Sequence, residues 1–210
     1  MNISNNTLLE LMLHIKTLTN EVYLVGGCVR DMLLRKSPKD FDVVTDVDLD
    51  QLTKVLLDNG WSVGEAGKQF LVLIASKNKE QFEIALFRED SKTSDGRRPD
   101  SVKKGSMETD FMRRDFSINS MYYNPFTCEL LDPSGNGKKD IENKIIRFNG
   151  KPAERIQEDY LRIFRAYRFS SQLGFALEPK TLRACRTYFE QACKTVSGQR
   201  ILIEVEKMSL

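Results

Sequence analysis

Several residue types that build common functional sites are scarce in this 210-residue sequence. It has one histidine and four cysteines, and no two cysteines form a CxxC pair. A zinc site needs a cluster of such ligands, so a zinc-binding constellation is excluded. We expect reduced and mostly packed thiols at Cys28, Cys128, Cys185 and Cys193. His14 lies in an amphipathic helical pattern and is expected to be a surface or packed residue.

Long apolar runs are also absent. No stretch approaches the roughly 20 apolar residues that cross a bilayer, and the N-terminal MNISNNTLLELMLHIKTL has no basic flank before a long apolar run. These absences predict a cytoplasmic protein without a membrane partner. With 40% hydrophobic residues, the chain can form one substantial domain and part of another.

Neither sign of charge dominates, since 32 Lys and Arg face 30 Asp and Glu, for a net charge of +2. The total therefore says little about a polyanionic partner. The distribution says more: residues 151–210 carry a net +4, and residues 1–150 a net −2. The second part is the better candidate for a nucleic-acid surface, although a solvated helical face would look similar.

Hydrophobic periodicity predicts most strands before residue 150 and helices after it. Helices are expected at 7–19, 29–34, 49–59, 110–121, 153–172, 179–192 and 198–208. Strands are expected at 22–25, 40–45, 70–75, 81–87 and 128–132. The polar segment 88–106 is expected to be a mobile loop, and 132–140 a cluster of turns. This order predicts an α+β domain over residues 1–150 and an all-helical segment over residues 151–210.

The stretch YLVGGCVRDMLLRKSPKDFDVVT, residues 23–45, carries the strongest chemical signal. Side chains two apart on an extended strand share a face, so Asp40 and Asp42 should project together while Phe41 enters a core. Two carboxylates on one face suit Mg²⁺, which prefers oxygen ligands and accepts a triphosphate as its remaining partner. Two metals roughly 3.5–4 Å apart activate an attacking hydroxyl and stabilise a leaving pyrophosphate.

Two glycines supply the other half of this pattern. Without side chains, Gly26 and Gly27 allow backbone amides to approach phosphate oxygens, and Arg30 on the following helical turn adds positive charge. A lone DxD is usually a surface strand edge, and a lone Gly-Gly is usually a tight turn. Their combination in the order strand, glycine turn, helix, strand favours a phosphoryl-transfer site.

A third carboxylate is a candidate in QFEIALF, where Glu83 alternates with apolar neighbours. Glu83 would face Asp40 and Asp42 if the two strands are adjacent. A solvent-facing glutamate on a half-buried strand explains the pattern equally well.

The run DFMRRDFSINSM, residues 110–121, places Arg113 and Arg114 among apolar side chains. Such a run is usually a surface ion-pair cluster. Because the surrounding residues are apolar, part of the charge should be half-buried and held in place. An arginine held in this way can bind a triphosphate or a ribose.

The segment QEDYLRIFRAYRFSSQLGF, residues 157–175, spaces Asp159, Arg162, Arg165 and Arg168 three residues apart on a predicted helix. One interpretation is a series of surface ion pairs worth a few tenths of a kcal/mol. The other is base recognition, because a carboxylate only accepts and a guanidinium only donates hydrogen bonds. Cytosine and adenine present an amino donor beside a ring-nitrogen acceptor, so an Asp159 and Arg162 pair would match them and oppose guanine and uracil.

Taken together, these motifs resemble the class II tRNA nucleotidyltransferases, which are CCA-adding enzymes, and the related bacterial poly(A) polymerases. The resemblance runs from about Tyr23 to the C-terminus. The matching segments are LVGGCVRDMLL with KDFD, FEIALFRED with DGRRPDSV, RRDFSINSM, LLDPSGNGKKDIENKIIRF and EDYLRIFRAYRF. It implies an α+β, polymerase-β-like nucleotidyltransferase head with a mixed β-sheet, followed by an all-helical neck.

The resemblance also implies a role for each matching residue. Asp40 and Asp42 would be the magnesium ligands, with Gly27 and Arg30 contacting the nucleotide. Arg114, with Arg113 beside it, would contact sugar and phosphate. The base would be read by Asp159 and Arg162, supported by Arg165 and Arg168. The loop at 88–106 matches a flexible loop thought to help switch between adding C and adding A.

The expected activity is template-independent addition of C, A or both to an RNA 3′ end, with tRNA as the expected RNA, from CTP and ATP with Mg²⁺. Family members usually continue into helical body and tail domains, so this chain is expected to hold the head and the start of the neck, either shortened or naturally short. The alternatives are a poly(A) polymerase and a nonenzymatic nucleotide- or RNA-binding fragment. A small-molecule nucleotidyltransferase would leave the base-reading helix without a purpose.

Overall fold

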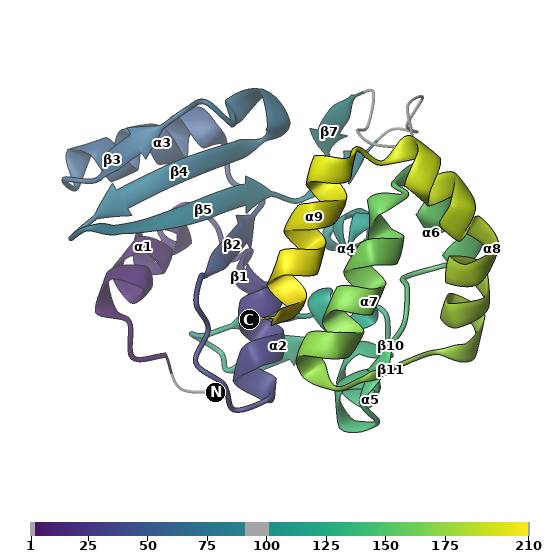
Figure 1. Ribbon diagram of the computed structural model, residues 1–210. Helices are drawn as coiled ribbons and strands as arrows, with labels where there is room; N and C mark the ends of the chain where they lie inside the picture. The colour runs from purple at the N-terminus through teal and green to yellow at the C-terminus, as the bar shows by residue number, and fades with distance from the viewer. Residues whose placement is uncertain (1–2, 91–100, 210) are drawn as a thin grey trace. The chain divides into compact units, whose positions relative to one another are not determined.

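Residues 3–90 and 101–209 are described by a computed structural model, and their contacts divide them into two units (Figure 1). The first unit comprises the described residues up to Glu89 together with Val102–Asp110 and Met121–Pro133. The second comprises Phe111–Ser120 and the described residues from Ser134 onward. Residues 134–150, which the sequence analysis grouped with the first domain, belong to the second unit by their contacts.

A seven-stranded mixed sheet forms the first unit, in the order β3-β4-β5-β2-β1-β8-β9. Only β2 and β5 pair in parallel, and the other pairs are antiparallel. The strands are β1 (Val22–Val25), β2 (Asp42–Thr45), β3 (Ser62–Gly64), β4 (Val72–Lys77), β5 (Glu80–Leu86), β8 (Tyr122–Asn124) and β9 (Glu129–Leu131). The predicted α+β class with a mixed sheet is therefore confirmed.

The two central strands β1 and β2 place the glycine turn next to the aspartate-containing segment. All four residues of β1 are buried, as expected of an apolar VYLV strand with neighbours on both sides. Its antiparallel register with β2 pairs Val22 with Thr45 and Val25 with Asp42. The end of β1, where the glycine turn begins, therefore lies beside the start of β2.

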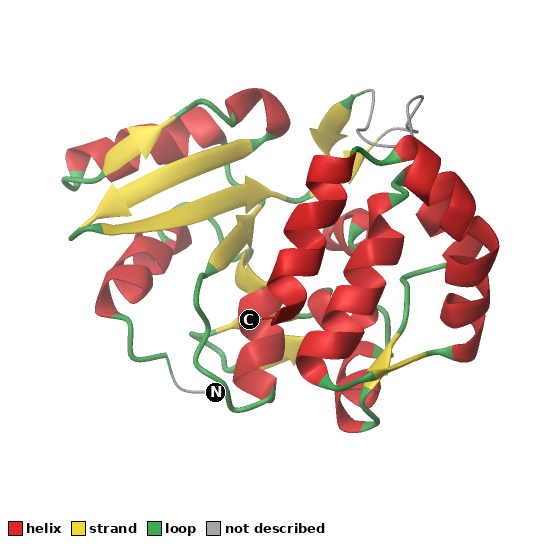
Figure 2. Ribbon diagram, viewed as in Figure 1, coloured by secondary structure: helices red, strands yellow, loops and turns green. Residues whose placement is uncertain are grey.

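Three helices accompany this sheet, drawn red beside the yellow strands in Figure 2: α1 (Asn6–Lys16), α2 (Gly27–Leu33) and α3 (Leu49–Asp58). Helix α1 buries Leu8, Leu11, Met12 and Ile15, the face that its sequence pattern predicts. The Asn5 side chain accepts a hydrogen bond from the Leu8 N–H at 2.7 Å and caps the helix. Helices α1 and α3 contact each other, and both contact the sheet.

Two expectations for residues 88–121 are wrong. The edges of the predicted loop are short strands, β6 (Arg88–Asp90) and β7 (Val102–Lys104), which pair with each other. Residues 91–100, and with them much of the proposed switching loop, lie outside the described residues. The predicted helix 110–121 is instead α4 (Met107–Arg113) followed by the short 3-10 helix η2 (Ser117–Asn119), because the Asp115 carboxylate captures the Phe116 N–H at 2.8 Å.

Helices dominate the second unit: α5 (Gly137–Glu142), α6 (Pro152–Glu158), α7 (Leu161–Leu173), α8 (Pro179–Thr195) and α9 (Gly198–Glu206), with a final 3-10 turn, η3 (Lys207–Ser209). Its two short strands, β10 (Ile145–Ile146) and β11 (Ala176–Leu177), pair in parallel. The expected continuous helix 153–172 is interrupted, since Asp159 has an extended backbone. Helix α5 begins within residues 132–140, the segment that was expected to hold only turns. None of the helices within residues 3–90 and 101–209 is long and apolar enough to cross a membrane.

Aromatic rings and apolar side chains fill the core of the second unit. Phe116 stacks on Phe148 with ring centroids 4.9 Å apart and meets Phe169 edge-on at 5.6 Å. Of the four free thiols, Cys28 and Cys185 are buried as expected. Cys128 and Cys193 are exposed, because one lies in the β8–β9 turn and the other on the outer side of α8.

The glycine turn yields a stability prediction. Gly26 has φ of 82° and ψ of −135°, which a side chain disfavours, so Gly26→Ala should lower the free energy of unfolding by about 1–3 kcal/mol. A Cβ at Gly27 would lie 3.5 Å from the nearest Arg30 nitrogen, an ordinary contact, so Gly27→Ala serves as the matched control. Urea denaturation measures both variants, and equal losses would contradict this account of the turn.

Candidate functional site

Two carboxylates of the first unit flank Phe41 at the start of β2. Asp42 is the first residue of that strand and is exposed, whereas Val43 and Val44 after it are buried. Asp40 is also exposed, and Phe41 between them is half-buried. The sequence analysis expected a strand over residues 40–45, but β2 begins at Asp42, so Asp40 and Phe41 precede the strand and the shared face of the two carboxylates stays a prediction.

Glu83 lies on the strand beside Asp42. Strand β5 pairs in parallel with β2, and Glu83 is the register partner of Asp42. Partners in register project from the same face of a sheet, so the two carboxylates are cross-strand neighbours. Among residues 3–90 and 101–209, however, no three His, Cys, Asp or Glu side chains gather closely enough to hold a metal ion.

The glycine turn and the first turn of α2 border the same strand ends. Gly26 follows Val25, the register partner of Asp42, and Gly27 opens α2. The Arg30 side chain, 11% exposed, donates from Nε to Asp31 at 2.9 Å, and its guanidinium lies over the position that a Gly27 side chain would occupy. An arginine, two carboxylates and side-chain-free backbone thus border one end of the β1–β2 pair.

Cys28, the second residue of α2, is buried. Its thiol donates a hydrogen bond to the Val25 carbonyl at 3.2 Å. Burial raises the pKa of Cys28 to about 11, with a smaller upward contribution from the Asp42 charge. The group is therefore a neutral, packed thiol at pH 7.

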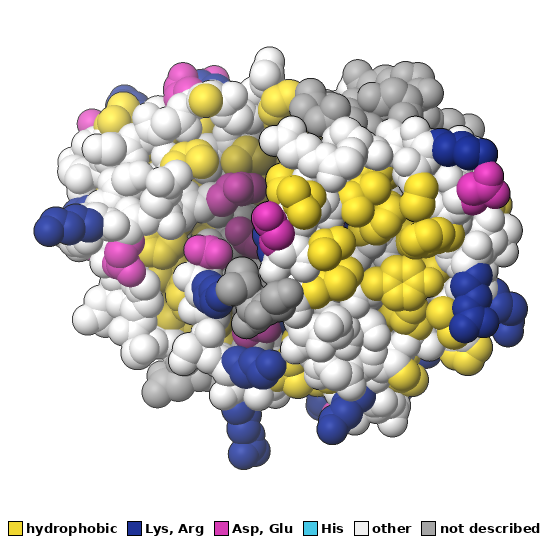
Figure 3. All heavy atoms as spheres, viewed as in Figure 1, with side chains coloured by type: hydrophobic (Ala, Val, Ile, Leu, Met, Phe, Trp, Pro, Cys, Tyr) yellow, Lys and Arg dark blue, Asp and Glu magenta, His cyan; other side chains and the backbone are white. Residues whose placement is uncertain are grey.

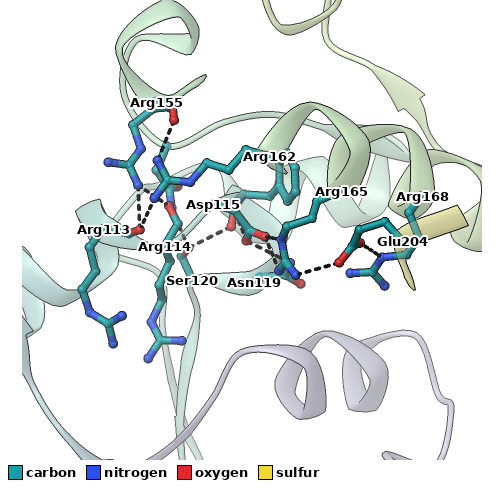
Figure 4. A network of polar contacts seen from close by, with 12 residues as sticks. Arg113, Arg114, Asp115, Asn119, Ser120, Arg155, Arg162, Arg165, Arg168 and Glu204 are labelled. Atoms are coloured by element: carbon teal, nitrogen blue, oxygen red, sulfur yellow. Dashed lines mark hydrogen bonds and ion pairs between the residues drawn. The ribbon is translucent and has the colours of Figure 1, made fainter. Parts of the chain in front are cut away.

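In the second unit, the backbone carbonyls of Arg113 and Arg114 are held by two other arginines (Figure 4). Arg155 donates to both carbonyls, at 2.6 and 3.1 Å, and Arg162 donates to that of Arg113 at 3.0 Å. The guanidinium groups of Arg113 and Arg114 extend away from these carbonyls. Burial, and to a smaller extent the neighbouring Arg162 charge, lowers the pKa of Arg155 to about 10.

A chain of alternating charges continues from this segment. Arg165 pairs with Asp115 at 2.5 Å and approaches Glu204 at 3.9 Å, and Glu204 in turn accepts from Arg168 at 2.5 Å. Burial alone would raise the pKa of Asp115, but the Arg165 charge, with hydrogen bonds from Asn119 and the Phe116 N–H, holds that pKa below its usual value. Arg165 and Arg168 are thus engaged by carboxylates of their own unit.

Asp159 occupies the break between α6 and α7. Its Oδ1 accepts the Leu161 N–H at 3.1 Å and lies 3.5 Å from Arg200 of α9. Burial raises the pKa of this carboxyl, opposed by the Leu161 hydrogen bond and the Arg200 charge. The i,i+3 pair of Asp159 with Arg162 does not form, because the helix is broken here and Arg162 pairs with Glu158 at 2.7 Å instead.

The candidate residues therefore fall into two groups. In the first unit, the register of three strands places Asp42 and Glu83 beside the strand end that leads into Gly26 and Gly27, and Asp40 and Arg30 lie nearby along the chain, before β2 and in α2. In the second unit, one polar network includes Arg113, Arg114, Arg162, Arg165 and Arg168, and Asp159 lies beside it at the start of α7.

Sequence reasoning missed four residues that hold the second group: Asp115, Arg155, Arg200 and Glu204. A signal for the last two was present. Glu204 is the lone acid in the apolar run ILIEV and lies four residues after Arg200, which places both on one helical face. In α9, Glu204 is the buried residue, whereas its apolar neighbours Leu202 and Val205 are exposed.

The Asp115–Arg165 pair predicts a pH-dependent stability. Because the folded-state pKa of Asp115 is lowered, its contribution is present above the unfolded value of about 3.9 and is lost as pH falls through the folded-state pKa. Asp115→Asn leaves a half-buried arginine without its main partner, and should cost on the order of 3 kcal/mol at pH 7. Urea denaturation from pH 7 to pH 3 should show the difference from the unmodified protein shrinking.

A matched control for this substitution lies on the surface. Glu190→Gln breaks the exposed pair with Lys194 and should change stability by less than about 0.5 kcal/mol at every pH. A loss for Asp115→Asn that is equally small, or independent of pH, contradicts the assignment.

Several known proteins are similar to this chain in sequence and in fold. A model of the poly A polymerase head domain matches residues 22–147. The chain is 40% identical over 190 residues to the CCA-adding enzyme of Bacillus subtilis (strain 168), covering 90% of this chain and 46% of that protein. It is also 40% identical over 194 residues to the CCA-adding enzyme of Enterococcus faecalis (strain ATCC 700802 / V583), covering 90% and 45%. The chain thus spans about half the length of these relatives.

Solved structures agree with the sequence comparisons. The crystal structure of the Bacillus stearothermophilus CCA-adding enzyme in complex with CTP is similar with a TM-score of 0.84 at 28% identity, covering 99% of this chain and 49% of that one. A tRNA nucleotidyltransferase complexed with a primer tRNA and an incoming ATP analog is similar with a TM-score of 0.72 at 29% identity, covering 89% and 52%. The chain therefore belongs to the family of the poly A polymerase head domain.

Proposed function

We propose that this chain is a template-independent, metal-dependent nucleotidyltransferase that adds C, A or both to the 3′ end of RNA, with CTP and ATP as substrates. The observation that carries the proposal is the register of β1 and β2, which sets Asp42 beside the strand end that leads into Gly26 and Gly27. The reaction is attack by an RNA 3′-hydroxyl on the α-phosphate, with pyrophosphate leaving. Residues 1–150 would act as the catalytic head and residues 151–210 as the neck.

Asp40 and Asp42 are the proposed ligands of Mg²⁺. Two exposed carboxylates flanking one half-buried residue fit a hard cation that takes its remaining ligands from phosphates and water. When bound, Mg²⁺ would neutralise phosphate charge and lower the pKa of the attacking hydroxyl. Glu83, the register partner of Asp42, is proposed as a neighbouring carboxylate that adds negative potential and not as a third ligand.

The backbone and charge beside these carboxylates suit a triphosphate. Gly26 and Gly27 have no side chains of their own to stand between the backbone and a phosphate, and Arg30 carries a guanidinium over Gly27. A guanidinium forms strong charge-assisted hydrogen bonds with phosphate oxygens. We therefore assign these residues to holding and orienting the nucleotide, with Arg113 and Arg114 as proposed contacts to its sugar and phosphates.

Base choice is proposed to rest on Asp159 and Arg162. The described contacts of Asp159 use Oδ1, which leaves Oδ2 as an acceptor. The Arg162 guanidinium has five N–H donors. Three hydrogen bonds from it are described, to Arg155, Glu158 and Arg113. The remaining acceptor and donors match the edges of cytosine and adenine. Arg165 and Arg168 support them indirectly, through the ion pairs that fix α7.

The relatives make tRNA the first RNA to test, since they are named CCA-adding enzymes and one related structure holds a primer tRNA. The experiment supplies a tRNA transcript that lacks its 3′ end, with Mg²⁺ and either labelled CTP or labelled ATP. Short products of defined length support the proposal. Long tails from ATP alone on generic RNA favour the poly(A) polymerase, and Mg²⁺-dependent nucleotide binding without incorporation favours a nonenzymatic fragment.

Removing the metal ligands should abolish turnover. Asp40→Asn and Asp42→Asn should each lower nucleotide incorporation by at least about 100-fold, because a bound metal contributes several kcal/mol of transition-state stabilisation. Both residues are exposed, so thermal unfolding should stay near that of the unmodified protein. Asp58→Asn, an exposed residue at the end of α3, is the matched control. Near-normal turnover in either test variant refutes the metal assignment.

The base-reading assignment is tested by Asp159→Asn. An amide still accepts the Leu161 N–H but offers donors beside its acceptor, so the variant should add U or G with less discrimination against them. Competition assays with all four nucleotides measure the incorporation ratios. Glu154→Gln in α6 makes the same charge change at an exposed position and should leave the ratios unaltered. Unchanged ratios for Asp159→Asn disprove the protein-template idea.

A further inference from the structure

Most cations of residues 151–210 are neutralised within their own unit. Seven of the eleven Lys and Arg in this range have an acidic partner within 4 Å. They are Lys151, Arg155, Arg162, Arg165, Arg168, Lys194 and Arg200. The net charge of +4 in this range is therefore concentrated on the few cations that remain.

Three of those remaining cations lie on one helix. Lys180, Arg183 and Arg186 of α8 have no acidic partner among residues 3–90 and 101–209, and all three are exposed. They follow one another at intervals of three, and each such step turns about 60° around the helix, so the three share one face. Dark blue side chains over α8 mark the right-hand edge of Figure 3.

The opposite face of α8 fixes the direction in which this cationic face points. Thr181, Cys185 and Ala192 are buried in the second unit. The start of the helix is held by Glu178, whose carboxylate accepts the Thr181 N–H at 2.7 Å. The one acid on the cationic face, Glu190, is occupied by Lys194 at 2.6 Å. Because α8 is anchored on its buried side, Lys180, Arg183 and Arg186 form a fixed row of positive charge.

We propose that the row Lys180, Arg183 and Arg186 binds the phosphate backbone of the RNA substrate. Spaced phosphates match spaced exposed cations, and binding them releases counterions, which favours association. Contacts of this kind position an RNA without reading its sequence. The inference rests on the proposed function, since it names the surface by which the same chain holds its RNA outside the reacting end.

The row differs from the other arginines of the unit in its chemistry. Arg165 and Arg168 are held by buried or half-buried carboxylates, so a polyanion would have to break ion pairs to reach them. The α8 cations require no such exchange. Their contribution should therefore be electrostatic and salt-dependent, and should depend on charge more than on the shape of the guanidinium.

The test neutralises the row in the full chain. The variant carries Lys180→Gln, Arg183→Gln and Arg186→Gln, and its control carries Lys139→Gln, Lys144→Gln and Lys207→Gln, three exposed cations outside α8. Fluorescence anisotropy measures the binding of a labelled tRNA transcript lacking its 3′ end, from 50 to 200 mM salt. We expect the variant to bind at least about tenfold more weakly at 50 mM salt, with a salt slope smaller by about 2.

A second variant separates charge from folding. Lys180→Arg with Arg183→Lys and Arg186→Lys keeps all three charges and should bind like the unmodified protein. CTP affinity should be the same in every variant. If the neutralised and control variants bind tRNA equally, or if the salt slope does not change, the inference is wrong while nucleotide addition by the unmodified chain still supports the proposed function.

Two further outcomes also decide the matter. An unmodified chain that neither binds nor extends tRNA overturns both proposals. If the neutralised variant no longer binds phosphatidylserine vesicles but still binds tRNA, the inference is wrong and the row binds an anionic membrane surface instead. Weaker tRNA binding with unaltered vesicle binding supports it.

Discussion

The antiparallel pairing of β1 with β2 is the constraint on which the first unit depends. Strand β1 is buried along its whole length, so its register cannot slip without exposing an apolar run. That register places Asp42 opposite Val25 and thereby beside the turn at Gly26. The parallel partner β5 adds Glu83 to the same row. Burial of apolar strands thus sets the geometry of exposed carboxylates, which by themselves would repel one another.

In the second unit, buried charge fixes helix α9 beside the apolar core. Helix α9 turns Glu204 inward and leaves Leu202 and Val205 outside, the reverse of an ordinary amphipathic helix. The buried Glu204 charge is compensated by Arg165 and Arg168, which both pair with this carboxylate. Asp115 pairs with Arg165 as well. Such pairs add little net stability but are costly to break, so they fix helix positions specifically.

The sequence predicted the first unit better than the second. Strand 22–25 and the capped N-terminal helix follow from local patterns, because apolar runs and Asn5 act on their immediate neighbours. The break at Asp159 was missed because its cause is a hydrogen bond from Leu161 that competes with helix continuation. Likewise, the ends of segment 88–106 pair as strands through contacts that no local periodicity encodes. The candidate site residues could be identified from the sequence, but their ion-pair partners, such as Arg200, could be identified only from the structure.

The central claim is that a metal-bound nucleotide lies at the end of the β1–β2 pair. Paramagnetic broadening of backbone amide signals by Mn²⁺, added with a nonhydrolysable CTP analogue, tests it most directly. We predict the strongest broadening at Gly27, Asp42 and Glu83, and much weaker broadening at Val22 and Thr45, which form the opposite end of the β1–β2 pair. Broadening that spares the glycine turn, or that centres on another part of the chain, would contradict the account.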